Sequence, residues 1–501
     1  MSQVKPFRII IAGGGLVGLS AAHIFQSLSD ALSASRDVQF TILEAHNSIT
    51  PFIGSLLLLY PSTFRVYDQV GLLSALEPVV DETKRTVSFR AEDGTVIYED
   101  NGFSDALERR HGHGFRVCHR PAFAECLYQG LSEQSKGNIL LGKRVVDVEV
   151  ETDGVRVVCQ DGTVVEGDVL IGADGVRSRV RSCMQRLRAG AQRSGASGNA
   201  GQADGEDGKS PYLAGFRLFF GNIPILPGLQ TCTNWEGGHP GISTQILTGT
   251  KQAWWAVYEQ IENPTRERVR YTEADKQKLL EKWGHLYMAP GYTMKEVLRY
   301  NSGKTGMINL EEGVIDTWTW NRIVLVGDAV RKVEPHAGLG FNQGMEDIVS
   351  IANKLHALLK RDTSTPDTED LERIFEQYQA ERLKVMPGID RMCRRRARQV
   401  AWPNWKFRIY ATWLLPYLPI TKAGLMYIVG PIVRKAPVLD WGEEHNLPAH
   451  EIEYEHFGVK DDRHRGATVS KSSQGCILPL GTAAGLLAGL AAVGFRYYRQ
   501  L

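Results

Sequence analysis

Three glycine-bearing turns, far apart in the chain, carry residue types that suit the binding of an extended dinucleotide. The first is Gly13-Gly14-Gly15-Leu16-Val17-Gly18 and the second is Gly172-Ala173-Asp174-Gly175; the third joins Gly327-Asp328-Ala329 to Gly338-Leu339-Gly340. Each turn follows an apolar, β-branched run that is typical of a buried strand. One such turn alone is weak evidence. Three in this order predict that most of a large domain binds one flavin dinucleotide, and that the chain is an enzyme.

The first turn has the pattern Gly13-x-Gly15-x-x-Gly18, between a strand predicted at residues 7–12 and a predicted helix. Glycines in this pattern allow a tight turn and a close approach of the backbone to a pyrophosphate at the positive end of the helix. Glu44 ends the next predicted strand, where a carboxylate accepts hydrogen bonds from the hydroxyls of an adenosine ribose. Taken alone, this pattern is compatible with either NAD or FAD.

The second and third turns are less regular. Asp174-Gly175 lacks the paired glycines and the helix of a second nucleotide fingerprint, so a strand-ending turn before a basic helix is the alternative interpretation. Asp328 ends a buried strand, where it can bond a sugar-like hydroxyl or cap a turn. Gly338 and Gly340 lead into a helix whose N-terminal amides could face a flavin ring oxygen and stabilise negative charge on the reduced ring.

Composition narrows the class of protein. The chain has 501 residues, 43% of them hydrophobic and 23% charged, which is ordinary for a globular protein with two or three cores. A net charge of +1 gives no reason to expect nucleic-acid binding. The seven cysteines form no CxxC pair, which predicts reduced thiols and no zinc site. No Ser/His/Asp set and no metal-ligand cluster stand out, so a cofactor is expected to carry the chemistry.

The elements that must position these residues predict an α/β fold. We expect a Rossmann-like FAD-binding domain built from discontinuous pieces, a mostly β substrate domain, and a C-terminal helical, membrane-associated region. The expected boundaries are 1–180 for the FAD-binding domain, with interleaved strands at 84–118; 211–320 for the substrate domain; 321–390 for the C-terminal part of the FAD-binding domain; and 391–460 for an aromatic, helical or interfacial region.

Four further segments lie outside that core. Residues 186–210 are rich in Gly, Ala, Ser, Gln and Arg, which predicts a flexible surface insertion. Residues 476–495 carry no charge and would form a helix about 30 Å long, which predicts a transmembrane helix; a buried or disordered Ala/Gly tail is the alternative. The basic run 394–398 predicts a solvated face or contact with anionic lipid. Aromatic residues in 402–417 predict either an interfacial anchor or a packed core.

In these motifs the chain resembles the FAD-dependent monooxygenases of the aromatic-hydroxylase type, over about residues 7–440. Within that group it is most similar to the membrane-associated enzymes of fungal meroterpenoid and indole-diterpene pathways, which epoxidise prenyl chains. The resemblance implies that NADPH reduces FAD, that O2 adds to give a flavin C4a-hydroperoxide, and that one oxygen atom passes to the substrate. The segments that carry the narrower resemblance are Pro51-Phe-Ile-Gly-Ser, Tyr60-Pro61, Asp68-Gln-Val-Gly-Leu72, Phe216-Arg-Leu-Phe-Phe-Gly221 and the aromatic C-terminal region.

The resemblance also implies roles for single residues. Arg120 matches an arginine that touches the cofactor, Asp174 matches an acid linked to both FAD and NADPH, and Asp328 matches the acid at the ribityl chain. Arg217 falls where related enzymes have a proposed active-site arginine. No metal site is implied. The residues expected to bind the cofactor are Gly13, Gly15, Gly18, Glu44, Gly54, Leu58, Arg120, Asp174, Asp328, Gly338, Gly340 and Phe341.

Two positions depart from the family pattern. Leu58 stands where the family usually has a small residue, and the nearest flavin-side glycine is Gly54. Phe341 stands where the family usually has Ala or Met. We expect these bulky side chains to reshape the flavin pocket. His336, just before the flavin-facing turn, could deliver a proton or could serve as a structural cap.

The expected function is epoxidation of the prenyl chain of a meroterpenoid or related terpenoid intermediate in secondary-metabolite biosynthesis, by an FAD-dependent monooxygenase that uses NADPH and O2. The first alternative is hydroxylation of an aromatic ring, which benefits from a base near the ring hydroxyl. The second is a non-catalytic, membrane-tethered flavin-binding protein. Expected partners are a lipophilic prenylated substrate, membrane lipid and a nearby terpene cyclase or prenyltransferase, with no nucleic acid. The expected location is the endoplasmic reticulum membrane, with a single pass near the C-terminus and the catalytic domain facing the cytosol.

Overall fold

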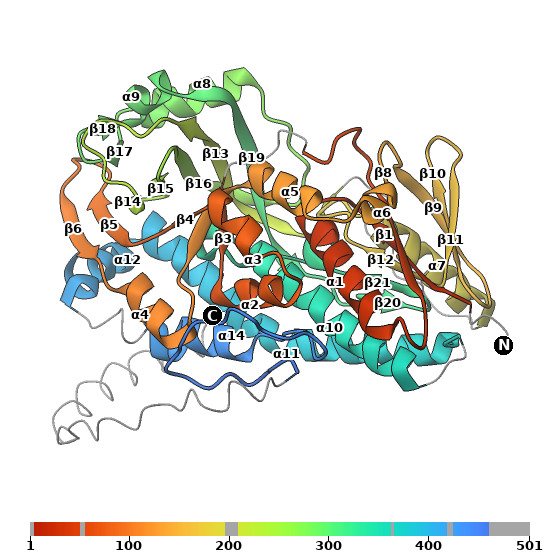
Figure 1. Ribbon diagram of the computed structural model, residues 1–501. Helices are drawn as coiled ribbons and strands as arrows, with labels where there is room; N and C mark the ends of the chain where they lie inside the picture. Colours follow the sequence, from red (N-terminus) through yellow and green to blue (C-terminus); the bar gives the residue numbers. More distant parts are fainter. Residues whose placement is uncertain (1–4, 51–55, 196–208, 362–364, 418–423, 460–501) are drawn as a thin grey trace, which may run out of the picture. The chain divides into compact units, whose positions relative to one another are not determined.

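The computed structural model describes residues 5–50, 56–195, 209–361, 365–417 and 424–459. Within these residues, two large sheets organise the protein (Figure 1). One is a six-stranded, mainly parallel sheet, and the other is an eight-stranded, mainly antiparallel sheet.

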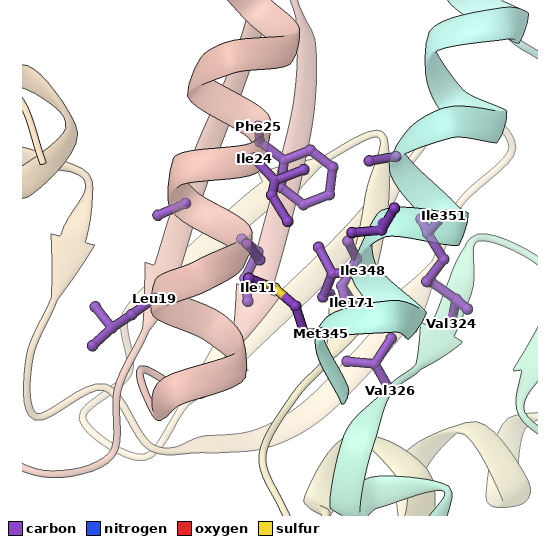
Figure 2. Close-up of a cluster of buried hydrophobic side chains, with 14 of the residues drawn as sticks. Ile11, Leu19, Ile24, Phe25, Ile171, Val324, Val326, Met345, Ile348 and Ile351 are labelled. Carbon is purple, nitrogen blue, oxygen red and sulfur yellow. The ribbon is translucent and has the colours of Figure 1, made fainter. Parts of the chain in front are cut away.

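The six-stranded sheet has the strand order β20-β21-β12-β1-β2-β8. Its strands are parallel except for β20. The central strands β12 and β21 are continuous apolar runs, as parallel strands buried on both faces require. Helices α1 and α10 pack together against the sheet, and Figure 2 shows Ile11 and Ile171 of the strands beside Ile24 of α1 and Met345 and Ile348 of α10. The bounds are β1 (Phe7–Ala12), β2 (Val38–Leu43), β8 (Ile139–Leu140), β12 (Val169–Gly172), β20 (Thr319–Trp320), β21 (Ile323–Leu325), α1 (Leu16–Leu32) and α10 (Leu339–Arg361).

This sheet draws its strands from the beginning, the middle and the later part of the chain. The expectation of a Rossmann-like domain built from discontinuous pieces is therefore confirmed.

The eight-stranded sheet has the order β22-β19-β13-β16-β15-β14-β5-β6. Strands β5 and β6 come from the interleaved segment expected at 84–118, and β5 joins the sheet through a parallel pairing with β14. The other pairs are antiparallel, so the substrate domain is mostly β as expected. The bounds are β5 (Arg85–Arg90), β6 (Val96–Asp100), β13 (Leu213–Ile223), β14 (Thr233–His239), β15 (Ile242–Thr248), β16 (Ala253–Thr265), β19 (Ser302–Val314) and β22 (Arg331–Lys332).

The two faces of this sheet are covered by different helices. On one, which we call the α8 face, Phe219 and Trp255 pack with Leu279 of α8 (Glu273–Trp283) and Val297 of α9 (Met294–Arg299). On the other, the α11 face, Phe216, Tyr258 and Leu310 pack with Ala397 and Ala401 of α11 (Thr368–Ala401). Because side chains alternate along a strand, this division decides which residues can reach the six-stranded sheet and its turns.

Smaller elements join the two sheets. A three-stranded antiparallel sheet β3-β7-β4 lies beside the flavin-facing turn, and the sheet β11-β10-β9 follows α6. The bounds are β3 (Leu56–Leu59), β4 (Val80–Glu82), β7 (Arg116–His119), β9 (Val145–Val150), β10 (Val155–Cys159), β11 (Val164–Gly167), β17 (Tyr287–Ala289), β18 (Tyr292–Thr293), α2 (Pro61–Gln69), α3 (Leu73–Leu76), α4 (Phe103–His111), α5 (Arg120–Gln129), α6 (Glu133–Gly137) and α7 (Arg179–Gly195), with short helices η1 (Glu77–Val79), η2 (Gly327–Ala329) and η3 (Pro335–Ala337).

Helix α7 corrects part of the insertion expected at 186–210. It continues to Gly195, so residues 186–195 are helical instead of irregular. Alanines and arginines, which favour helix, offset the glycines in this stretch. Residues 196–208 lie outside the described part of the chain.

The region after α11 is a series of short helices, as the prolines in it predict. Asn404 begins it as the N-cap of α12, accepting hydrogen bonds from the amides of Lys406 and Phe407. None of the helices in the described part of the chain is both long and apolar enough to cross a bilayer. The helix predicted at 476–495 lies outside the described residues. The bounds are α12 (Trp405–Ile409), η4 (Tyr410–Leu414), η5 (Leu415–Tyr417), η6 (Leu425–Val429) and α14 (Gly430–Lys435).

Residues 436–459 follow α14 without regular structure and bind helix α2; we call them the C-terminal strap. Arg65 is fully buried and donates from Nε and Nη2 to the two carboxylate oxygens of Glu444, at 2.9 and 2.7 Å. Asp68 accepts from the backbone and side-chain amides of Asn446 at 2.8 Å each. Residues near the far end of the described chain thus bind Arg65 and Asp68 on the polar face of α2.

Candidate active site

The first two glycine turns lie against one another at the carboxyl edge of the six-stranded sheet. Gly13 has φ +107°, and a β-carbon on it would lie 2.5 Å from the carbonyl oxygen of Ala173. Ala173 N donates to Ala12 O at 2.8 Å, because β1 and β12 are neighbours. A β-carbon on Gly18 would lie 2.0 Å from Gly13 O. Only glycine fits at these two positions.

The third turn joins the same edge. Val326 N donates to Gly172 O at 3.0 Å, since β21 pairs with β12. A β-carbon on Gly327 would meet the side chain of Val17, at the start of α1, at 3.5 Å. The structure therefore brings the three glycine turns together, as their order along the chain predicts.

Gly15 provides the test of whether these residues fit a dinucleotide. It is the N-cap of α1, where no side chain caps the helix and no acid lies in the first turn. A β-carbon on Gly15 would meet no described atom within 4 Å, so the space above this helix end is open to a ligand. A helix N-terminus with free access favours an anion such as pyrophosphate. The residues present fit FAD.

Glu44 lies directly beside this turn. Its carboxylate accepts from Gly14 N and from His46 N, each at 2.7 Å, and the side chain is buried. Both backbone amides hold the carboxylate in one orientation. This is the position that suits a ribose, and the predicted role is unchanged.

Asp174 and Asp328 have structural partners of their own. Asp174 Oδ2 accepts from the backbone of Arg179 at 2.7 Å and of Val180 at 3.1 Å, so it caps the start of α7. Burial raises the pKa of this carboxyl. Asp328, half-exposed, forms an ion pair with Lys332. Both acids thus lie at the predicted turns, and their roles toward FAD or NADPH remain predictions.

A buried ionic network anchors the third turn to the helices. Asp347 accepts from Gly327 N at 2.9 Å and forms ion pairs with Arg331 at 2.7 Å and with Arg382 of α11 at 3.0 Å. Arg382 also binds Glu346 at 2.8 Å. A network in which every charge is paired fixes α10 and α11 relative to the turn.

The flavin-facing turn at residues 337–340 is held from one side by Asn342. Its Nδ2 donates to Leu58 O at 2.9 Å and to Gly338 O at 2.7 Å. Its Oδ1 accepts from Tyr60 N at 3.0 Å and from Thr63 Oγ1 at 2.7 Å. This one side chain therefore ties β3, α2 and the turn together. The sequence does not reveal this role, because Leu58, Tyr60 and Thr63 become neighbours of Asn342 only in the fold.

Leu58 lies in contact with the flavin-facing turn, and its expected contact with the flavin remains a prediction. Its Cδ2 would be 2.5 Å from a β-carbon on Gly338, which has φ +66°. Leu58 also packs against Val117, Leu247 and Trp254, and so connects the turn with the α11 face.

The other residues expected near the ring are placed as follows. Phe341 is buried, and its ring meets that of Phe123 edge-on with centroids 5.7 Å apart. It therefore belongs to the main core between α10 and α5. Arg120 is exposed at the first position of α5, directly after β7. Gly340 is the second residue of α10, and Gly54 lies outside the described residues.

Glu334 and His336 form a buried pair just before the flavin-facing turn. His336 Nδ1 lies 3.1 Å from Glu334 Oε2, and the two side chains are 3% and 1% exposed. The ring of His336 lies 4.0 Å from that of Tyr258 and 6.3 Å from that of Phe216, both on the α11 face. The sequence analysis named His336 alone. The signal for its partner was a second ionisable residue two positions earlier, in an otherwise apolar run.

Arg217 corrects one expectation. Its neighbours Phe216 and Leu218 lie on the α11 face, so Arg217 points to the α8 face, where it binds Glu259 with Nε at 2.6 Å. Glu259 is further held by Trp283 of α8 at 2.8 Å. The structure does not bring Arg217 to the glycine turns, and its expected active-site role is withdrawn.

The basic run 394–398 is also not simply a solvated face. Arg396 binds Glu236 of β14, and Arg394 binds Glu312 of β19 at 3.0 Å. These ion pairs join α11 to the eight-stranded sheet and leave fewer charges for contact with lipid.

Comparison with known proteins shows the family to which this chain belongs. The family described as "FAD binding domain" matches residues 7–205 and 261–389. The FAD-dependent monooxygenase srdH of Neurospora crassa is 31% identical over 86% of this chain and 95% of its own. The FAD-dependent monooxygenase atmM of Aspergillus flavus is 25% identical over 90% of this chain and 92% of its own.

Solved structures show the same fold at lower identity. HpxO of Klebsiella pneumoniae, complexed with FAD and uric acid, has a TM-score of 0.65 at 17% identity, covering 86% of this chain and 98% of that one. A salicylate hydroxylase in a substrate complex has a TM-score of 0.60 at 18% identity, covering 86% and 97%. With the matched family spanning the glycine turns and a near full-length relative above 30% identity, the chain belongs to the FAD-binding-domain family and is an FAD-dependent monooxygenase.

Proposed function

We propose that this monooxygenase epoxidises the prenyl chain of a meroterpenoid or related terpenoid intermediate in fungal secondary-metabolite biosynthesis, with NADPH as the reductant. The observation that carries the proposal is the apolar surface of the α11 face beside the flavin-facing turn. The fungal FAD-dependent monooxygenases among the relatives support the class of reaction. Because these relatives are named as monooxygenases over nearly their full length, the non-catalytic alternative is not retained.

The apolar surface comes from the three-stranded and the eight-stranded sheets. Leu58 and Leu56 of β3 are half-buried and pack with Leu247 and Trp254 of the α11 face. Leu218, also half-buried, packs with Phe216 on the same face. Such a surface favours an alkenyl chain, since each buried methylene contributes about 0.8 kcal/mol. It also excludes water from the place where oxygen is transferred.

Bound FAD supplies the redox chemistry and the activation of O2. The chain's own residues would bind FAD and orient the substrate. Gly13, Gly15 and Gly18 would hold the pyrophosphate at the N-terminus of α1, and Glu44 would accept from the ribose. Asp328 would bind the ribityl chain. For epoxidation, the protein must hold the double bond in place and keep water out, and neither task needs a protein nucleophile.

The test is turnover of the purified, FAD-loaded chain with NADPH, 18O2 and prenylated phenols or indoles. We expect one 18O atom in the product, located on the prenyl chain by fragment masses. NADH in place of NADPH should support slower oxidation. An unchanged prenyl chain with every candidate would overturn the epoxidase proposal.

Ring hydroxylation is the second candidate function. The buried Glu334–His336 pair favours it, because attack by a phenol ring gains from a base near its hydroxyl. In the same experiment, 18O on the ring with an intact prenyl chain would support this alternative.

We also propose that the protein works at a membrane. The expected site is the endoplasmic reticulum membrane, with the catalytic domain facing the cytosol. Four aromatic residues in the short helices after α11 are strongly exposed: Trp405 by 67%, Trp413 by 70%, Tyr417 by 82% and Tyr427 by 76%. Exposed Trp and Tyr are typical of the bilayer interface. A lipophilic substrate would reach the enzyme there, supplied by a prenyltransferase and consumed by a terpene cyclase.

Brominated lipids test the membrane proposal, because they quench tryptophan fluorescence only on contact. We expect vesicles of anionic brominated lipid to quench the wild-type chain. W405F/W413F should lose most of that quenching. W283F, which removes a tryptophan from the α8 face, should retain it. Equal quenching in both variants would contradict this interfacial surface.

A further inference from the structure

The Glu334–His336 pair has unused hydrogen-bonding capacity in a buried position. Glu334 Oε2 and His336 Nδ1 are hydrogen-bonded to one another at 3.1 Å. The other atoms of the pair, His336 Nε2 and Glu334 Oε1, are buried and have no hydrogen-bond partner among the described residues. A buried polar atom left unpaired costs about 1–3 kcal/mol, so such atoms point to a missing partner.

The groups that face the pair are mostly neutral. Tyr258 lies on it from β16, and burial raises the pKa of its hydroxyl, which donates to Gln245 Oε1 at 2.9 Å. Cys393 approaches from α11, and burial raises the pKa of its thiol to about 12. Glu312 of β19 has its pKa raised by burial and is paired with Arg394 of α11 at 3.0 Å. Arg394 is thus already bound to an acid.

This environment selects the kind of group that completes the pair. An imidazole nitrogen backed by a carboxylate accepts a proton, and the carboxylate stabilises the imidazolium that forms. A substrate carboxylate would be repelled by Glu334. The flanking rings of Phe216 and Tyr258 suit a planar, aromatic or enolic ring.

We propose that Glu334 and His336 form a proton-accepting site for an acidic hydroxyl on the substrate, so that the substrate joins a phenol or enol head group to its apolar chain. This inference rests on the proposed function, to which it adds the head group.

The step at this site balances within the substrate and the pair. His336 Nε2 forms a bond to the hydroxyl proton, the O–H bond breaks, and its electron pair stays on the substrate oxygen. Glu334 accepts the hydrogen bond from Nδ1–H and balances the imidazolium charge. When the product leaves, the proton passes from Nε2 back to the same oxygen atom. The net charge of the pair is then the same as before binding.

A chromophoric probe tests the site without turnover. The probe is a geranyl-substituted 4-nitrophenol, whose phenolate absorbs visible light, and the reference ligand is its O-methyl ether. Both are titrated into the FAD-loaded full chain without NADPH, at a pH where the free probe is mostly protonated. We expect a phenolate band on binding and an affinity for the phenol at least tenfold above that for the ether.

Variants test whether the phenolate band depends on Glu334 and His336. H336Q keeps a polar atom near the Nε2 position but cannot take a proton, so the phenolate band should disappear and the phenol should bind about as the ether does. E334Q should weaken the band severalfold. E259Q, a change of a buried acid on the α8 face, should leave the band unchanged. Flavin absorbance per chain confirms that each variant is loaded.

The proposal is overturned if wild type binds the phenol and the ether equally, a comparison that needs no variant. It is also overturned if H336Q retains the full phenolate band. A phenolate band without any epoxide in the turnover experiment would overturn the epoxidase proposal alone.

Discussion

The side chain of Leu58 fills the space that a β-carbon on Gly338 would need, with Cδ2 2.5 Å and Cβ 2.6 Å from that position. Gly338 also has φ +66°, a conformation that favours glycine. A strand of one sheet and the flavin-facing turn are therefore fitted to one another at the backbone.

Gly338→Ala should lower stability by about 2–3 kcal/mol, because overpacking and the left-handed backbone both oppose it. Thermal unfolding and flavin content measure the effect. L58A/G338A should recover part of the loss, since only the steric part is relieved. Gly190→Ala, in an exposed position of α7 with open space around it, is the control and should not destabilise. A tolerated Gly338→Ala would mean that the turn adopts a different backbone conformation.

Gly15→Ala should separate cofactor binding from folding. Its added methyl group meets no described atom within 4 Å, and Gly15 has φ −70°, which alanine also adopts. The melting temperature without FAD should stay within about 2 °C, because a change of 0.5 kcal/mol or less is expected for such a site. The affinity for FAD should fall at least tenfold, because the methyl group would occupy the space of the pyrophosphate. Unchanged FAD affinity would contradict the predicted position of the cofactor.

Arg217→Met should leave catalysis nearly intact, because Arg217 lies on the α8 face with Glu259. We expect kcat/KM to stay within about threefold and stability to fall by about 1–2 kcal/mol, since Glu259 keeps Lys282 and Trp283 as partners. Lys282→Met, which removes another partner of the same acid, is the matched control. A loss of about 100-fold in kcat/KM, the size typical of a lost catalytic donor, would restore Arg217 to the active site.

Stability should fall as the pH drops below neutral. Burial lowers the pKa of His111 and of His113 from 6.5 to about 4. The unfolded chain then binds more protons between pH 6.5 and about 4, so the contribution of each histidine is present above pH 6.5 and is lost toward pH 4. At pH 5 the loss is about 2 kcal/mol for each, at 1.36 kcal/mol per unit.

Urea unfolding at pH 7, 6 and 5 measures this dependence. His111→Phe should reduce the slope, since both ring nitrogens of His111 are buried without a partner among the described residues. His445→Gln should not change it, because His445 is largely exposed. An unchanged slope in His111→Phe would assign the acid sensitivity to other groups.

The sequence predicted the parts of the site that are local in the chain. Gly13 and Gly18 are required by the backbone itself, so glycines at this spacing reveal the turn. The orientation of Arg217 could not be predicted from the sequence, because a one-residue shift in strand register moves a side chain to the other face of the sheet. Strand β13 contains such a shift between Ala214 and Phe216, and no sequence pattern marks it.

Contacts between segments that are distant in the chain could not be predicted from the sequence either. Asn342 joins residues more than 270 positions away, so its role follows from the fold and not from its neighbours in sequence. The Glu334–His336 pair is local, yet its burial comes from Tyr258 and Phe216 of the other sheet. Local chemistry was predictable; which side chains become desolvated was not.

Helix α2 is synthesised early, but Arg65 meets its partner Glu444 only 379 positions later. At typical synthesis rates of about 5–20 residues per second, that gap lasts roughly 20–75 seconds. A guanidinium cannot be buried alone, so α2 stays incomplete while the ribosome is still at work. Tyr60 and Thr63, which hold the flavin-facing turn through Asn342, lie next to or in that helix. The cofactor site is therefore finished only after Glu444 has left the ribosome, long after α2 itself has been synthesised.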